Sequence, residues 1–133
     1  MRRYLVTYLA VLVLFILIDG IWLGLVAVDF YREGLGELMA PTPNWAAAVA
    51  FYLIYPAGLV FIAIAGTDRP AMAGVALRAA VLGFIAYMTY DLTNLATLRD
   101  WPLGLSLLDM VWGALLSAVS ASLGWRITSA AFK

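Results

Sequence analysis

The sequence contains no cysteine and no histidine in 133 residues. The absence of cysteine excludes disulfide bonds, thiol catalysis and thiolate metal sites. The absence of histidine removes the usual pH switch, the usual general base and the usual zinc or haem ligand. Acid–base chemistry in this chain is therefore restricted to aspartate, glutamate and tyrosine side chains.

Charged residues are also scarce, because they make up only 12% of the chain and the eight basic and eight acidic residues cancel. This balance gives no support for binding nucleic acid or for a polybasic lipid-binding tail. Hydrophobic residues make up 65% of the chain, whereas soluble domains use roughly 45–50% apolar residues. The composition indicates an integral membrane protein that lies in the lipid bilayer.

Four hydrophobic windows are each long enough for the roughly 20-residue span of a bilayer. They run about residues 4–28, 44–65, 71–98 and 103–125, with short polar connections between them. The sequence therefore predicts an all-α polytopic membrane protein. We expect an antiparallel bundle of four transmembrane helices that forms one domain over residues 1–133. The first window exceeds the apolar region of a signal peptide and is expected to remain a span.

The basic residues predict the orientation, because lysine and arginine prefer the cytoplasmic side of a membrane. Six of them lie on the side of the two termini, and only Arg32 and Arg99 lie on the other side. Both termini are therefore predicted to face the cytoplasm. The six are Arg2, Arg3, Arg69, Arg78, Arg126 and Lys133. Arg78 lies two turns inside the third window and is expected to extend toward the inner headgroups.

The longest connection, DFYREGLGELM and the residues after it, follows the first window on the predicted outer side. It mixes apolar and charged side chains, and two glycines interrupt it. Two interpretations are equally supported: a short amphipathic segment that lies on the outer surface, and a plain loop.

Three of the four windows carry an aspartate well inside their apolar run: Asp19, Asp91 and Asp109. A carboxyl group in hydrocarbon costs roughly 2.5–3.5 kcal/mol on insertion scales, so it needs a compensating role. At 1.5 Å per residue, each aspartate lies about 10 Å from the outer end of its helix. Tyr52 and Tyr55 of the second window fall near the same level. The sequence therefore predicts one polar layer across the bundle, in its outer half.

The polar residues of the third window recur at spacings of three and four, which places them on one helix face. The fourth window has rows of small residues that allow close helix packing, including Gly113 and Ser117. The first and fourth windows each carry Asp-x-x-Trp, which places Trp22 and Trp112 one turn from the carboxyl group of their own helix. The stripe of the third window comprises Gly83, Tyr87, Tyr90, Asp91 and Asn94.

These residues resemble the bacterial domain-of-unknown-function family numbered two-one-seven-seven, which comprises predicted inner-membrane proteins of about this length. The resemblance runs through LIDGIWLG, FYLIYPAGLVFIAI, YMTYDLTNLATLRDWP and LLDMVWGALLSA. Its most specific part is YDLTNLA followed by the Trp-Pro turn and the second Asp-x-x-Trp-Gly. The resemblance implies a multi-pass protein of the bacterial inner (cytoplasmic) membrane, and it implies no biochemical activity.

Two roles for the polar layer follow from the residues. In the first, the aspartates are interhelical hydrogen-bond partners in a structural or accessory subunit of a homo-oligomer or a larger membrane complex. In the second, they form a site that binds or transports a small or amphipathic ligand, with or without coupled proton movement. The aromatic side chains then form the walls and offer cation–π contacts. This site comprises Asp19, Trp22, Tyr52, Tyr55, Tyr87, Tyr90, Asp91, Asn94, Asp109 and Trp112.

A third role, an enzyme that modifies a lipid or an isoprenoid, is the least supported. Asp19, Asp91, Asn94 and Asp109 are oxygen ligands of the kind that Mg²⁺ and Ca²⁺ prefer. However, phosphate chemistry also needs basic partners, and no arginine is predicted at this depth. The acid pairs typical of metal-dependent prenyl- and phosphatidyl-transferases are absent. The sequence therefore favours a site with no catalytic residue, no metal and no cofactor.

Overall fold

The computed structural model describes residues 1–67 and 70–132, which are mostly helical. Five α-helices follow one another along the chain: α1 (Arg2–Ile21), α2 (Val28–Leu35), α3 (Trp45–Leu59), α4 (Met72–Thr97) and α5 (Leu103–Ala131). A π-helical turn extends α1 over η1 (Trp22–Val26), and another extends α3 over η3 (Val60–Ile64). The short 3₁₀ turn η2 (Gly36–Leu38) follows α2.

Four of these helical segments are long and apolar enough to cross a membrane: Arg2–Val26, Trp45–Ile64, Met72–Thr97 and Leu103–Ala131. Many of their large apolar side chains lie on the surface, including Ile54 and Leu77. Such a surface suits lipid, because soluble monomers rarely expose apolar patches of more than a few hundred Å². The predicted all-α polytopic architecture is confirmed.

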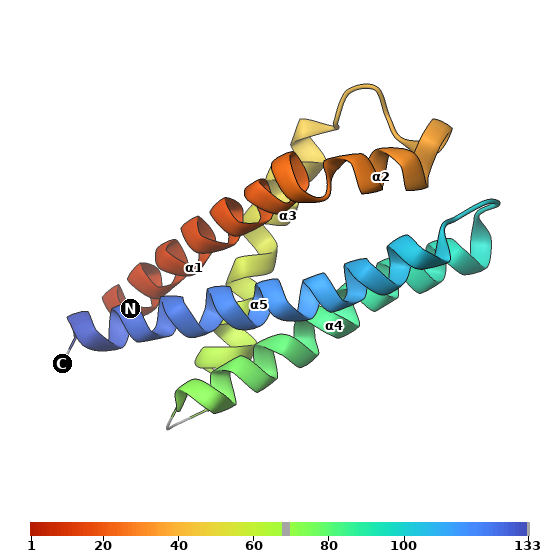
Figure 1. Cartoon of the computed structure of the whole chain (residues 1–133). Coiled ribbons are helices and arrows are strands. Elements are labelled where there is room, and N and C mark those ends of the chain that lie inside the picture. The colour runs from red at the N-terminus through yellow and green to blue at the C-terminus, as the bar shows by residue number, and fades with distance from the viewer. Residues whose placement is uncertain (68–69, 133) are drawn as a thin grey trace.

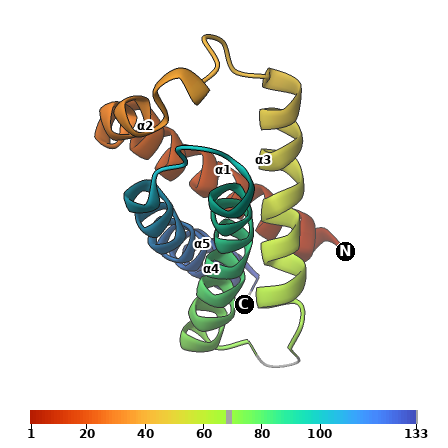
Figure 2. The ribbon, with the colours of Figure 1, turned by 90° about the vertical axis from the view of Figure 1, so that its right-hand side faces the viewer.

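Helix α5 is the centre of the bundle and packs against both α1 and α4. These three helices run along similar lines, whereas α3 crosses them steeply (Figure 1). Helix α3 packs against α1, and its extension η3 packs against α4. Figure 2 shows α3 standing apart at one side of the bundle. The four spans therefore form an incomplete bundle in which α3 is the least enclosed.

Glycines allow α4 and α5 to approach closely. A Cβ atom added at Gly83 would lie 2.1 Å from the Gly113 carbonyl oxygen and 2.4 Å from Ser117 Oγ. A Cβ atom at Gly113 would lie 2.3 Å from the ring of Tyr87. Since the bilayer provides no hydrophobic force between helices, such close backbone contact is a main source of helix association. The small residues of the fourth window thus pack as the sequence predicts.

The second span contains Pro56 inside α3 and ends in the π turn η3. A proline lacks the N–H that a regular helix would use there, so the surrounding structure must accommodate a missing hydrogen bond. Arg78 of α4 donates from Nε and Nη2 to the Ala63 carbonyl of η3, at 3.0 and 2.8 Å. Its guanidinium group is therefore held by η3 and does not simply extend to the headgroups.

The start of α1 and the end of α5 lie at one end of the bundle, which we call the termini end. Thr7 donates to Thr128 across 3.1 Å there, and Arg3 donates to Ser129 across 3.4 Å. Helix α5 continues to Ala131, beyond the expected boundary at residue 125, because Thr128 packs against α1. The opposite end is the α2 end. Arg69 and Lys133, used to predict the orientation, lie outside the described residues, and the orientation stays a prediction.

The first part of the long connection at the α2 end is helical, and residues 39–44 form an irregular segment that leads to α3. Helix α2 follows a break at Ala27 and ends at Gly36, whose φ of 50° favours glycine. A plain loop is therefore wrong for residues 28–38, while the position of this segment on the outer surface stays a prediction. Helix α2 contacts α5 as well as η1, and it lies next to the cavity described below.

Candidate functional site

Asp19 is buried between three helices and accepts two hydrogen bonds. Its Oδ2 accepts from Tyr52 Oη of α3 at 2.6 Å, and its Oδ1 accepts from Trp112 Nε1 of α5 at 2.9 Å. The Asp19 side chain is only 4% exposed. One carboxyl group of α1 therefore joins α3 and α5. The two hydrogen bonds offset the free-energy cost of burying this polar group.

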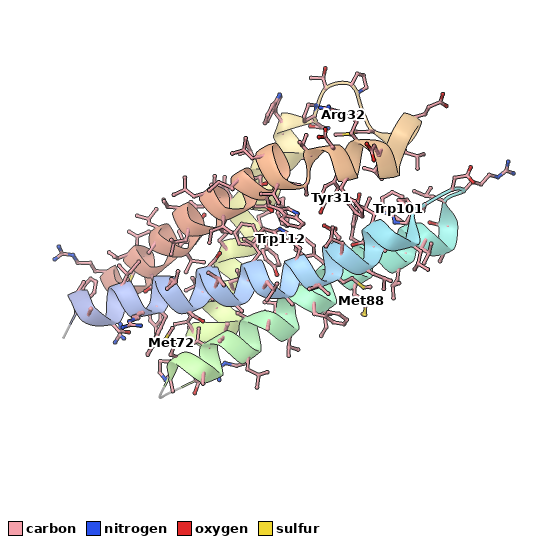
Figure 3. All side chains as sticks on the ribbon, in the orientation of Figure 1. Tyr31, Arg32, Met72, Met88, Trp101 and Trp112 are labelled. Atoms are coloured by element: carbon pink, nitrogen blue, oxygen red, sulfur yellow. The ribbon has the colours of Figure 1, made fainter. Side chains whose placement is uncertain are left out.

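Asp109 is the second buried carboxyl group, and it accepts a hydrogen bond from Tyr31 Oη of α2. Tyr31 Oη in turn accepts from Trp22 Nε1 at 3.4 Å. The indole rings of Trp22 and Trp112 stack with centroids 4.2 Å apart and planes 10° from parallel. Figure 3 shows Tyr31 on the side of α2 that faces α5, and Trp112 between α1 and α5.

The two Asp-x-x-Trp segments therefore interact crosswise. Each indole was expected near the carboxyl group of its own helix, but Trp112 bonds to Asp19 of the other helix. Trp22 reaches Asp109 of the other helix through Tyr31. This difference follows from the antiparallel packing of α1 on α5, which places the Asp of each segment opposite the Trp of the other. The sequence spacing alone does not contain this register.

A cavity of about 480 Å³ lies beside these two carboxyl groups. That volume falls within the roughly 300–1,000 Å³ of typical small-molecule sites. Each of the α-helices that the structure describes contributes to its lining, and most of its wall is apolar or aromatic. The lining residues are Asp19, Leu23, Tyr31, Ala48, Phe51, Tyr52, Ala86, Tyr87, Tyr90, Asp109 and Trp112.

Six of the ten residues of the predicted polar layer line this cavity: Asp19, Tyr52, Tyr87, Tyr90, Asp109 and Trp112. Trp22 does not line the cavity itself, but it contacts two lining residues, Trp112 and Tyr31. Tyr55 lies one turn of α3 from Tyr52, on the side of the termini end. Its hydroxyl group forms a hydrogen bond with Ser117 Oγ at 2.8 Å. Its ring contacts that of Tyr87, with centroids 6.3 Å apart. This Tyr55–Tyr87 contact joins α3 to α4 on the side of the termini end.

Asp91 and Asn94 lie outside the cavity lining. The Asp91 side chain is 1% exposed, and no hydrogen-bond donor reaches either of its carboxyl oxygens in the part of the chain that the structure describes. The nearby Trp101 indole donates instead to Ser106 Oγ at 2.9 Å. Asn94 is half-buried, one turn nearer the end of α4. Asp91 is thus the unsatisfied member of the three acids.

Tyr31 is the site residue that sequence reasoning missed. It belongs to α2, outside the membrane spans, where burial and the Asp109 carboxyl group raise its pKa above the ordinary value of 10.0. Its hydroxyl group therefore stays protonated and remains a hydrogen-bond donor at neutral and moderately alkaline pH. The amphipathic interpretation of the connection was the available signal, because such a helix turns one face toward the bundle.

Replacing Tyr31 with phenylalanine is expected to loosen α2. A hydrogen bond contributes roughly 0.5–1.5 kcal/mol, so the amides of residues 28–35 should exchange several-fold to about tenfold faster. Hydrogen-exchange mass spectrometry in lipid nanodiscs measures this rate. Tyr8→Phe is the control, because it removes a tyrosine hydrogen bond to the Leu53 carbonyl, far from α2. Equal exchange in the parent and in Tyr31→Phe would show that this bond does not hold α2.

Metal ligation finds no support in the geometry. Within residues 1–67 and 70–132, no three acidic side chains come together in a group that could hold a metal ion. The oxygen ligands considered for Mg²⁺ or Ca²⁺ are divided, because Asp19 is committed to Tyr52 and Trp112. The site therefore offers carboxyl groups, phenols and indoles to a ligand.

Comparison with known proteins identifies the family but no relative of known function. The family model described as "Predicted membrane protein (DUF2177)" matches residues 4–126. No curated protein and no solved structure matches the chain. The matched range includes all the residues that line the cavity. The chain therefore belongs to this family of predicted membrane proteins, as the resemblance of its Asp-x-x-Trp and YDLTNLA segments implied.

Proposed function

We propose that the cavity binds the positively charged head of an amphipathic small ligand. The observation that carries this proposal is the lining itself, which includes the carboxyl groups of Asp19 and Asp109. Among the described residues, no arginine or lysine lines the cavity to balance them. A carboxylate in a low-dielectric site attracts a cation more strongly than one in water, because the attraction is screened less there.

The aromatic wall suits the same ligand. Phe51, Tyr52, Tyr87, Tyr90 and Trp112 present rings to the cavity. Aromatic faces attract ammonium groups by roughly 0.5–2 kcal/mol each, and more when water is excluded. Neutral donors such as Tyr52 Oη and Trp112 Nε1 stabilise the Asp19 carboxylate without cancelling its charge. An amine or quaternary ammonium group would supply the missing positive charge.

The position of α3 supports an amphipathic ligand that enters from the bilayer. Helix α3 meets α4 through η3 and through the Tyr55–Tyr87 ring contact, both on the side of the termini end. Nearer the α2 end, the lining residues between these helices include the small side chains of Ala48 and Ala86. Phe51 and Tyr90 at this position are substantially exposed. An alkyl chain could lie between α3 and α4 while its head reaches the carboxyl groups.

In the predicted orientation, with both termini in the cytoplasm, the cavity lies in the outer half of the bilayer. The protein would then take its ligand from the outer leaflet. Location in a bacterial inner membrane, as the family resemblance implies, belongs to the same proposal. Binding alone requires no particular orientation, so the experiment below tests the site without testing the topology.

A structural role is the second candidate, because both Asp19 oxygens already accept hydrogen bonds from the protein. In that case the aspartates hold the helices in register within an accessory subunit or an oligomer. This role predicts that no cation competes for the carboxyl groups. The two candidates therefore differ in a direct binding measurement.

The parent protein, in nanodiscs of neutral phosphatidylcholine, is expected to bind decyltrimethylammonium and not decanesulfonate, which has the same chain length and the opposite charge. Asp109→Asn should weaken binding about 30-fold, because losing one partner of a buried charge pair costs roughly 2 kcal/mol or more. Titration calorimetry, with empty nanodiscs as the blank, measures both affinities.

Asp29→Asn is the matched control, because it makes the same chemical change at a side chain that is 81% exposed on α2. It should leave the affinity unchanged. Equal binding of the two amphiphiles by the parent protein, or parental affinity in Asp109→Asn, would contradict a cation site and favour the structural role.

A further inference from the structure

The packing of α4 on α5 places Asp91 beside Asp109. Gly83 of α4 lies against Ser117 of α5, and Tyr87 lies against Gly113. Since the helices are antiparallel, moving four residues forward in α4 corresponds to moving four residues back in α5. One further step of this register brings Asp91 opposite Asp109. The register therefore places the two carboxyl groups side by side. Ser106 lies one turn from Asp109 on α5, and its hydroxyl group accepts a hydrogen bond from the Trp101 indole.

Two carboxyl groups that lie side by side in the buried contact between α4 and α5 cannot both be ionised without a nearby cation. Asp91 is 1% exposed and receives no hydrogen bond from any described donor, so a negative charge there would lose its hydration without a compensating hydrogen bond. Asp109, in contrast, accepts a hydrogen bond from Tyr31. Neighbouring buried acids avoid repulsion when one of them keeps its proton. Asp91, which has no such donor, is therefore the member of the pair that keeps its proton.

We infer that the protein exchanges a proton for its ligand, and this inference rests on the proposed cation site. Binding of the cation beside Asp109 releases the proton held by Asp91. The O–H bond of the Asp91 carboxyl group breaks, the proton passes to water, and the positive charge of the ligand takes its place. The net charge of the buried site is therefore the same before and after binding.

Other groups near the pair do not supply this proton. Tyr31 lies on α2, Tyr52 on α3 and Tyr87 and Tyr90 on α4, and all are phenols that hold their protons at neutral pH. Asp19 of α1 is the other acid of the cavity, and it has two hydrogen-bond donors where Asp91 has none. Arg99 and Asp100, in the turn after α4, are exposed charges. Asp91 is therefore the acid near the cavity that lacks any hydrogen-bond donor, and it is the group from which the proton is released.

Calorimetry of decyltrimethylammonium binding, in nanodiscs at one pH, tests the exchange with two buffers of different ionisation enthalpy. The probe has no dissociable proton, so any proton taken up by the buffer comes from the protein. The parent should release about one proton per ligand, and its affinity should rise with pH by up to about tenfold per unit. Asp91→Asn should still bind the probe but release few protons and lose this pH dependence.

The controls separate this inference from the proposed function. Asp29→Asn should behave like the parent in both buffers, and size-exclusion profiles identify any variant that fails to fold. Binding without proton release in the parent, or parental proton release in Asp91→Asn, would overturn the exchange and leave the cation site standing. Absence of binding in the folded parent would overturn the cation site itself, and the exchange with it.

Discussion

Gly83→Ala is expected to lower the free energy of unfolding by roughly 3 kcal/mol, at the upper end of the usual cost of overpacking. The new methyl group would overlap the Gly113 carbonyl oxygen, 2.1 Å from the ideal Cβ position, and a backbone atom cannot move aside without separating the helices. Since α5 is the centre of the bundle, α4 would be displaced from it. Unfolding in mixed detergent micelles, followed by tryptophan fluorescence, measures the loss.

Gly58→Ala is the matched control for this substitution. Gly58 lies inside α3, and nothing lies within 4 Å of an added Cβ atom there. Alanine is the better helix former by about 1 kcal/mol, so this variant should be as stable as the parent or slightly more stable. Similar stability of Gly83→Ala and Gly58→Ala would show that α4 and α5 do not pack at the separation described.

Asp19→Ala is expected to cost roughly 2 kcal/mol, the second-largest effect on stability. It removes the carboxyl group to which Tyr52 Oη and Trp112 Nε1 donate, so both half-buried donors lose their acceptor. A polar contact between helices in a bilayer contributes about 0.6 kcal/mol on average and up to about 1.7, and the lost side-chain volume adds to this cost. The same unfolding measurement applies.

Tyr52→Phe removes one of these two hydrogen bonds with little change of shape, so it should cost less than Asp19→Ala. Asp19→Asn keeps an acceptor and nearly the same shape, and it should retain most of the parental stability. If Asp19→Ala proved as stable as the parent, the Asp19 carboxyl group would not join the three helices, and the polar layer would lose its structural basis.

The sequence alone determined the membrane architecture of this protein. Four apolar windows of sufficient length require four helices, because only regular hydrogen bonding satisfies a backbone in hydrocarbon. Sequence also identified the buried acids, since an aspartate at that depth is costly wherever its helix lies. The identity of Asp19, Tyr52, Tyr87, Tyr90, Asp109 and Trp112 as one group followed from depth and helical periodicity.

Only the tertiary structure decided how these residues are paired. Helical periodicity fixes which residues share a face, but the axial and rotational register between helices depends on packing contacts such as Gly83 on Gly113. That register places the indole of each Asp-x-x-Trp segment toward the opposite carboxyl group, brings Tyr31 of α2 onto Asp109 and leaves Asp91 without a donor. The steep path of α3 across the other helices likewise arises from contacts between segments far apart in the chain.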